Sequence, residues 1–164
     1  EGSIDLCGNK VALLSIGVGF NQRLTGRENI LLSGMLLGYT ETEVRAKMQE
    51  IIDFAEIGQF IDKPVRTYSS GMHSKLAFAI TTVLETDVML VDEVLSVGDE
   101  RFKKKSFNKM KELISNKERT VMIVSHNIAQ LNELCDTVMW MHEGKIIKIG
   151  PSEEVLAEYK EFMK

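Results

Sequence analysis

The stretch Val88-Met89-Leu90-Val91-Asp92-Glu93 decides the fold, because it predicts a short buried strand that ends in two carboxylates. An apolar run of this length suits a strand better than a buried helix. A second run of the same kind covers residues 121–124 and ends in Ser125-His126. Between the two runs, apolar residues recur at helical spacing: Phe102, Phe107, Met110, Leu113 and Ile114. Strand, helix and strand in this order predict a parallel βαβ unit, and therefore an α/β fold.

Two helices are predicted before this unit. The first carries an apolar stripe at helical spacing, behind a capping box formed by Thr40 and Glu43. The stripe consists of Val44, Met48, Ile51, Ile52 and Ala55. The second helical pattern covers residues 74–84. Residues 3–20 mix short apolar stretches with glycines, so we expect strands and turns there.

Four more elements are predicted after the βαβ unit. Apolar spacing indicates a helix over residues 128–134, and a strand follows over residues 138–141. A turn at Gly144 leads into another strand over residues 145–149, most simply as a hairpin. Ser152 is expected to cap a final helix.

Composition limits the classes of function. The chain has 164 residues, 44% of them hydrophobic, which suits one globular domain. Its net charge of -4 argues against nucleic-acid binding, and the run Lys103–Lys105 is expected to be a solvated helix face. Cys7 and Cys135 are isolated, so neither a metal-binding spacing nor a disulfide framework is predicted, and a reducing cytosol fits. No apolar run reaches the roughly 18 residues of a membrane span, so we expect no direct membrane insertion.

Polar residues follow both predicted strands of the βαβ unit. Ligands of parallel sheets bind beyond the carboxyl ends of the strands, where Asp92, Glu93 and His126 are expected. One carboxylate could hold Mg²⁺ while the other faces a water molecule. The imidazole could donate a hydrogen bond to a phosphate oxygen. Taken singly, an acidic pair or a histidine at a strand end is more often an ordinary solvated terminus.

A third polar element is Tyr68-Ser69-Ser70-Gly71-Met72, directly ahead of the helix predicted over residues 74–84. Two hydroxyl groups and a glycine at a helix N-terminus predict an anion site, because unpaired backbone N–H groups point there. A serine in this place is also a common helix cap, so this motif alone is not specific.

Together, these motifs resemble the ABC ATPase family in their order and spacing. Tyr68–Met72 resembles its signature sequence, and Val88–Glu93 resembles its Walker B strand. Ser96-Val97-Gly98-Asp99 resembles its D-loop, and His126 its switch histidine. The resemblance covers essentially the whole chain.

The resemblance implies a role for each motif. Asp92 would serve Mg²⁺, Glu93 would polarise the attacking water, and His126 would contact the γ-phosphate. The signature sequence and D-loop, through Ser69, Ser70, Gly71, Met72 and Asp99, would close on ATP held by a second copy of the subunit. The implied cofactors are ATP and Mg²⁺, and the implied assembly is a homodimer.

The particular residues found in several motifs narrow the resemblance to one subfamily. Leu24-Thr25-Gly26-Arg27-Glu28-Asn29-Ile30, the Tyr-Ser-Ser-Gly-Met signature and Ser125-His126-Asn127 resemble ATP-binding subunits that export teichoic acid or O-antigen-type polysaccharide. Such a subunit sits peripherally on the cytoplasmic face of the plasma membrane and works with an integral-membrane permease. The exposed loop from Leu36 to Thr40 is the expected permease contact, and the stripe that begins at Val44 is expected to be core.

The phosphate-binding P-loop, G-x-x-x-x-G-K-[ST], does not occur in these 164 residues. The pair Gly144-Lys145 fails the pattern on both sides. We therefore expect a partial nucleotide-binding domain, truncated at its N-terminus and inactive alone. Gln22 lies near the place of the family's Mg²⁺-linking glutamine, but its spacing to Leu24 is too short, and the role is left unassigned.

The expected architecture is a mainly parallel α/β domain with an inserted helical subdomain. Residues 1–23 would be a remnant of an N-terminal sheet region, residues 24–73 the helical subdomain, and residues 74–164 the α/β lobe. Two alternatives stay open. One is an ABC-type ATPase with another transport substrate or a DNA-repair function; the latter would need a long coiled-coil insertion, which is absent from this sequence. The other is a non-catalytic domain that keeps only the fold and its contacts.

Overall fold

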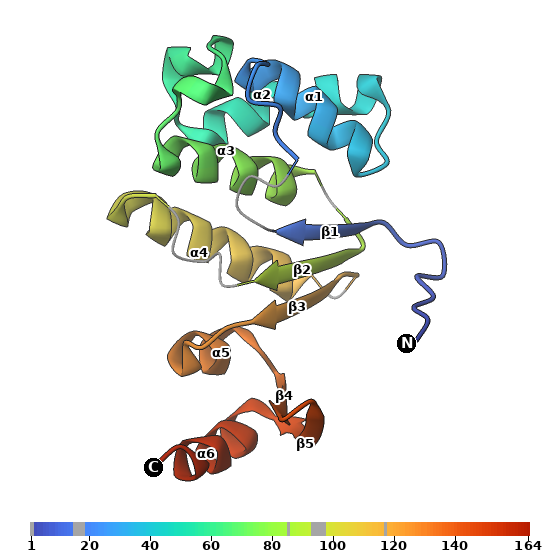
Figure 1. Ribbon diagram of the computed structural model, residues 1–164, viewed down its shortest axis with the longest axis vertical. Helices are drawn as coiled ribbons and strands as arrows, with labels where there is room; N and C mark the ends of the chain where they lie inside the picture. The colour runs from blue at the N-terminus through green and yellow to red at the C-terminus, as the bar shows by residue number, and fades with distance from the viewer. Residues whose placement is uncertain (1, 15–18, 85, 93–97, 117) are drawn as a thin grey trace. The chain divides into compact units, whose positions relative to one another are not determined.

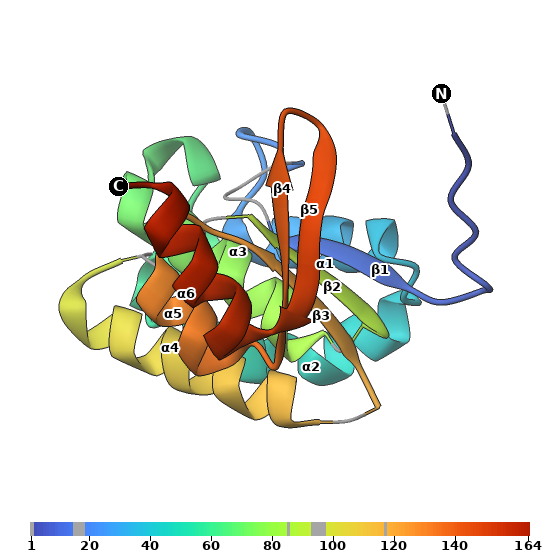
Figure 2. The same cartoon turned by 90° about the horizontal axis from the view of Figure 1, so that it is seen from below.

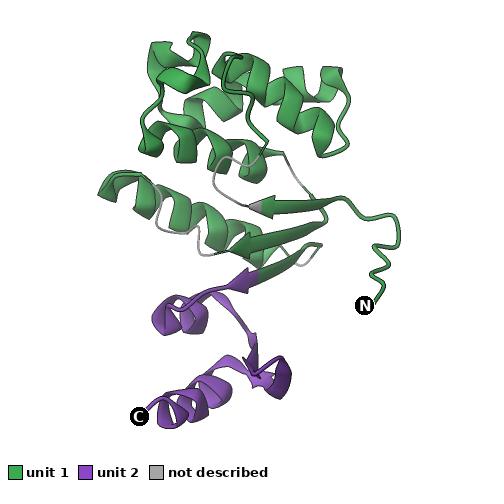
Figure 3. Cartoon of the chain, in the orientation of Figure 1, with its two compact units in different colours: residues 1–122 green, residues 123–164 purple. Residues whose placement is uncertain are grey.

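The computed structural model describes residues 2–14, 19–84, 86–92, 98–116 and 118–164. It divides the chain into two compact units, residues 1–122 and 123–164 (Figure 3). None of the described helices is both long and apolar enough to span a membrane.

A three-stranded sheet is formed in the order β1-β2-β3 by β1 (Val11–Leu14), β2 (Val88–Asp92) and β3 (Thr120–Val124), and the unit boundary falls within β3. β1 pairs with β2 in parallel, and their arrows and that of β3 point the same way in Figure 1. Ala12 lies opposite Met89 in this pairing, and both are buried. α4 (Glu100–Ser115) connects β2 and β3 along the chain. The predicted βαβ unit and the α/β fold class are confirmed.

The described part of unit 1 also contains the helices α1 (Gly26–Leu36), α2 (Glu41–Ala55) and α3 (Ser70–Val83). Two short 3-10 turns, η1 (Gly58–Asp62) and η2 (Val65–Thr67), connect α2 with α3. Capping boxes open both α1 and α2: Thr25 with Glu28, and Thr40 with Glu43. The second box is the predicted one.

The core of this region is apolar and continuous between the three helices. It includes Ile30 of α1, four residues of the predicted stripe on α2, and the buried face of α3: Val44, Met48, Ile51, Ala55, Leu76, Ala79, Ile80 and Val83. The stripe of α2 is therefore core packing, as expected. α1 and α2 approach closely at Gly34, where an added methyl group would collide with the side chain of Val44.

One boundary in unit 1 differs from the prediction. The helix expected from residue 74 begins at Ser70, because Ser69 caps it and the first helical bond runs from the N–H of His73 to the carbonyl of Ser69. Between residues 3 and 20, the described residues contain one strand, β1, and a hydrogen-bonded turn closed by the N–H of Asn9 on the carbonyl of Leu6.

Unit 2 contains α5 (Ile128–Leu134), the hairpin of β4 (Thr137–His142) and β5 (Lys145–Pro151), and α6 (Ser152–Phe162). The predicted helix, hairpin and final helix are confirmed. Figure 2 shows α6 beside the hairpin, and the ring of Trp140 on β4 contacts Tyr159 and Phe162 of α6 at centroid distances of 5.7 and 5.0 Å.

Ser152 does not cap α6, so this prediction was wrong. The cap position is taken by Pro151, which has no side-chain hydrogen bond, and Ser152 is the first residue of the helix. The N–H of Ser152 donates to the carbonyl of Asp136 at 3.0 Å, which fixes the start of the helix through the backbone instead.

Candidate functional site

The predicted signature sequence forms the N-terminus of α3. Ser69 has an extended backbone, and its hydroxyl accepts a hydrogen bond from the N–H of Met72 at 3.2 Å. Ser70, Gly71 and Met72 form the first turn of the helix, where the prediction had placed them ahead of it. The first helical bond is made by the N–H of His73, so the helix ladder supplies no acceptor for the N–H groups of Ser70 and Gly71. Backbone donors at this end suit an anion.

This helix end is open to solvent and yet firmly held. Ser69 and Ser70 are exposed, and a methyl group at Gly71 would meet only the hydroxyl of Ser69, at 3.9 Å. Behind them, Leu76 and Phe78 are fully buried and fix the helix in the core. An anion could therefore approach the first turn without displacing the fold.

A hydrogen bond and an aromatic contact hold the residues on either side of this end. The hydroxyl of Tyr68 donates to the carbonyl oxygen of Phe60 at 2.8 Å, and burial raises the pKa of Tyr68. The ring of His73 lies 4.8 Å from the ring of Phe20, and burial lowers the pKa of His73. A neutral imidazole is therefore favoured beside the helix end.

Asp99 of the predicted D-loop caps α4. Its carboxylate accepts from the N–H of Phe102 at 2.9 Å and from the ammonium group of Lys75 at 2.7 Å. The Lys75 hydrogen bond and then the Phe102 N–H lower the pKa of Asp99 to about 2. The carboxylate is thus charged throughout the physiological range. The structure therefore brings Asp99 to α3, the helix of the signature sequence, through a residue that the sequence had not indicated.

Asp92 ends β2 with its side chain exposed, directly after the buried Val91. The carboxylate therefore stands at the carboxyl edge of the parallel sheet, as predicted. Mg²⁺ at phosphate sites takes one or two protein carboxylates and completes its shell with phosphate and water. The exposed carboxylate of Asp92 at this edge fits that need. Glu93, with residues 94–97, lies outside the described residues.

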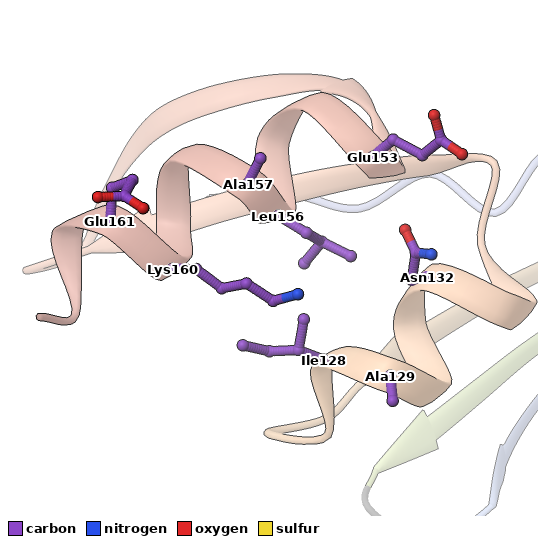
Figure 4. A pocket seen from close by; sticks show the side chains of 8 residues that line it. All are labelled: Ile128, Ala129, Asn132, Glu153, Leu156, Ala157, Lys160 and Glu161. Atoms are coloured by element: carbon purple, nitrogen blue, oxygen red, sulfur yellow. The ribbon is translucent and has the colours of Figure 1, made fainter.

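His126 belongs to unit 2, where it follows β3 and is exposed. It lines a cavity of about 170 Å³ together with Ser125, Trp140 and Tyr159. A larger and more open groove of about 810 Å³ lies between α5 and α6. Figure 4 shows the apolar side chains of Ile128 and Leu156 in this groove and the charged residues Glu153, Lys160 and Glu161 that also line it. None of the residues that line the groove is a predicted site residue.

Sequence reasoning missed two features of unit 1. Lys75 stands one helical turn after Gly71, and that spacing on a helix predicted to open an anion site was the available signal. Asn29 is fully buried, and its side chain is bonded to four backbone groups of the loop ahead of α1. The Leu24–Ile30 motif therefore also stabilises the loop ahead of α1, through the hydrogen bonds of Asn29.

Comparison with known proteins places the chain in a family. The model of the family described as "ABC transporter" matches residues 2–96, more than half of the chain. An O-antigen export system ATP-binding protein of Myxococcus xanthus is 46% identical over 98% of this chain and 37% of its own length. A teichoic acids export ATP-binding protein of Enterococcus faecalis is 44% identical over 99% of this chain and 36% of its own length. The chain thus spans little more than a third of these two relatives.

Solved structures agree on the fold. An ATP-binding subunit of an ABC transporter superposes with a TM-score of 0.78 at 18% identity, covering 92% of this chain and 62% of that one. An ATP-binding cassette in a dimeric post-hydrolysis state, bound to ADP and Pi, gives 0.70 at 19% identity and covers 88% and 63%. With the predicted motif order and the parallel sheet, these findings show that the chain belongs to the ABC transporter family and has the fold of part of its ATP-binding domain.

Proposed function

We propose that this chain is part of the ATP-hydrolysing subunit that powers export of a cell-surface polysaccharide across the cytoplasmic membrane. One observation carries the proposal: identities of 46% and 44% over nearly the whole chain to proteins named for O-antigen export and teichoic acids export. Both names describe export of a surface polymer by an ATP-binding protein. The shared class, a polysaccharide, is therefore the proposed cargo of the transporter.

In this proposal the carboxyl edge of the sheet carries the chemistry. Asp92 holds Mg²⁺, which neutralises charge on the nucleotide phosphates when it is bound. Glu93 accepts a hydrogen bond from the attacking water and so orients and polarises it. His126 donates a hydrogen bond to the γ-phosphate as negative charge develops there. The exposed carboxylate of Asp92 at the end of β2 supports this assignment.

The N-terminus of α3 binds phosphate in this proposal. Ser69, Ser70, Gly71 and Met72 close over the γ-phosphate of an ATP held by a second copy of the subunit, and Asp99 stands beside them. Support comes from the backbone N–H groups of Ser70 and Gly71, for which the helix supplies no acceptor, and from the open space at Gly71. Each copy therefore completes the site of the other, and hydrolysis requires a dimer.

The subunit works at the cytoplasmic face through an integral-membrane permease. Residues 24–73 serve as the helical subdomain that meets the permease, residues 74–164 form the α/β lobe, and residues 1–23 belong to the N-terminal sheet region. The loop from Leu36 to Thr40 is the proposed contact, because Leu36 is 70% exposed, whereas the apolar stripe of α2 is packed in the core. Leu36 is the last residue of α1, and an exposed apolar side chain at the start of this loop suits a protein contact.

The 164 residues alone are proposed to bind ATP weakly and to be inactive, because they contain no P-loop to supply the phosphate cradle and its lysine. Titration calorimetry of this polypeptide with Mg-ATP tests the point. Binding in the low micromolar range would contradict it and would require another phosphate cradle.

The decisive test uses the natural protein that contains this sequence, assayed with its permease. Glu93→Gln keeps the size of the side chain but removes the charge that polarises water, so phosphate release should fall roughly 100-fold while ATP still binds. ATP should then hold the protein as a stable dimer in size-exclusion chromatography. Glu118→Gln is the matched control, since Glu118 is exposed and lies outside every predicted motif.

Normal hydrolysis by Glu93→Gln, without a trapped dimer, would refute the catalytic assignment. The cargo is tested separately, by depleting the protein and measuring polysaccharide on the cell surface and inside the cell. If depletion leaves the surface polysaccharide unchanged, while the purified protein hydrolyses ATP, the transporter has another substrate.

A further inference from the structure

Lys75 connects two parts of the proposed phosphate site that are far apart in the sequence. It lies on α3, four residues after Gly71, and its ammonium group donates to the Asp99 carboxylate at 2.7 Å. The Lys75 side chain is only 14% exposed, while that of Asp99 is 60% exposed. A largely buried cation therefore reaches out to the carboxylate at the turn before α4.

The stem of Lys75 also packs against the backbone of that turn. Gly98 has a φ of +76°, and a methyl group there would lie 3.0 Å from Cε of Lys75 and 3.1 Å from Cβ of Phe102. A side chain at residue 98 would therefore crowd both Lys75 of α3 and Phe102 of α4. Only glycine combines this backbone conformation with so close an approach.

On the other side, Phe102 anchors the turn in the core. Its ring is fully buried and meets the rings of Phe54 on α2 and Phe78 on α3 at centroid distances of 5.9 and 6.1 Å. The ammonium group of Lys75 lies 5.0 Å from the Phe102 ring centroid. One lysine thus contacts both the charged end and the buried anchor of the same turn.

We propose that Lys75 is a positioning residue that holds the Gly98–Asp99 turn in register with the signature residues at the N-terminus of α3. The inference rests on the proposed function. Gly71 and Lys75 lie one turn apart on the same face of α3, so a displacement of the Asp99 turn is passed to the phosphate-binding end of α3, and the reverse. The two segments that face the nucleotide of the partner copy therefore move as one body. Lys75 itself touches neither nucleotide nor metal in this assignment.

The test compares Lys75→Met with Lys75→Arg in the natural protein, assayed with its permease. Methionine keeps an unbranched stem and removes the charge, so kcat should fall about 10-fold, on the scale of a misplaced catalytic group, while ATP affinity stays unchanged. Arginine keeps the ion pair and should restore most of kcat. Lys104→Met is the matched control, because Lys104 is exposed on α4 and lies outside every predicted motif.

A double-mutant cycle separates positioning from general destabilisation. If Lys75 acts through Asp99, the loss in Lys75→Met with Asp99→Asn should be clearly smaller than the product of the two single losses. Should Lys75→Met fail to fold, Asp99→Asn alone carries the test, since asparagine can still cap Phe102 but loses the ion pair; kcat should again fall.

Comparison with the Glu93→Gln variant distinguishes failure of the positioning role of Lys75 from failure of the proposed function. If Glu93→Gln stops hydrolysis while Lys75→Met, well folded, keeps the normal kcat, the positioning role is overturned and the proposed function stands. If neither variant changes hydrolysis, the proposed function falls, and the positioning role falls with it. An equal loss in Lys75→Arg and Lys75→Met, or independent effects of Lys75 and Asp99, would also overturn the positioning role.

Discussion

The hydroxyl oxygen of Tyr68 occupies the space that a side chain at Gly26 would need. Tyr68 is the first residue of the signature sequence, and Gly26 opens α1 within the Leu24–Ile30 motif. Two motifs that serve as family markers are therefore packed directly against each other. The carbonyl oxygen of Phe60, which accepts the Tyr68 hydrogen bond, keeps the phenol in this position.

Gly26→Ala should destabilise the fold by about 1 to 3 kcal/mol, because the new methyl group meets Tyr68 and also lies 2.9 Å from Cδ1 of Ile61. Urea unfolding of the natural protein measures the change. Removing the hydroxyl with Tyr68→Phe should reduce the cost of Gly26→Ala. Gly2→Ala is the control, since nothing lies within 4 Å of its added methyl group. Equal stability of Gly26→Ala and wild type would contradict the packing described.

Asn29→Ala should cost about 1 to 3 kcal/mol of unfolding free energy, because it removes the bonds of a fully buried side chain and leaves the N–H of Asn21 without its acceptor. The Asn29 amide donates to the carbonyls of Asn21 and Thr25 at 3.1 and 2.9 Å, and its oxygen accepts from the N–H of Asn21 at 2.8 Å. Asn108→Ala, on the exposed face of α4, provides the matched control and should change stability little. A small change in unfolding free energy at both positions would mean that the loop ahead of α1 does not depend on the hydrogen bonds of Asn29.

Gly71→Asp should abolish hydrolysis by the natural protein while nucleotide binding stays nearly intact. A carboxylate in the first turn of α3 would repel the γ-phosphate of the partner copy's ATP. Gly71→Ala tests shape without charge, and the open space at Gly71 predicts that it folds normally. Phosphate release and ATP affinity are measured in parallel. Unchanged turnover with Asp on both copies would remove residues 68–72 from the site.

Asp99 should make stability depend on pH in acid. Its pKa is lowered from 3.8 to about 2 in the folded chain, so the charged carboxylate contributes stability that is fully present above 3.8. This contribution is lost as the pH falls through about 2. The difference in unfolding free energy between wild type and Asp99→Asn should therefore shrink as the pH is lowered from about 5 toward 2. The same comparison in the Lys75→Met background should show a smaller change, and a pH-independent difference would contradict the ion pair.

Local patterns in the sequence predicted much of the fold. Strand β2 could be predicted because Val88–Val91 is apolar and short. Helix α2 could be predicted because Thr40 and Glu43, three residues apart, have the spacing of a capping box. The start of α6 was missed because the backbone bond between Ser152 and Asp136 leaves no local sign. The candidate site divides in the same way. Asp92 stands at the strand end expected from its motif, and Ser69 forms the helix cap that a serine in this place commonly forms. The cap formed by Asp99 was not predicted, and the bond from Lys75 to Asp99 joins residues that only the folded chain brings together.

The close approach of α1 and α2 at Gly34 has an evolutionary consequence. The Val44 side chain fills the place of a side chain at residue 34, so the two positions share one fixed volume. A larger residue at position 34 is compatible with this packing only when position 44 becomes smaller. Natural homologues that keep this helix pair should therefore show compensating sizes at the two positions, and a lineage that changes one of them passes most easily through a small residue at both.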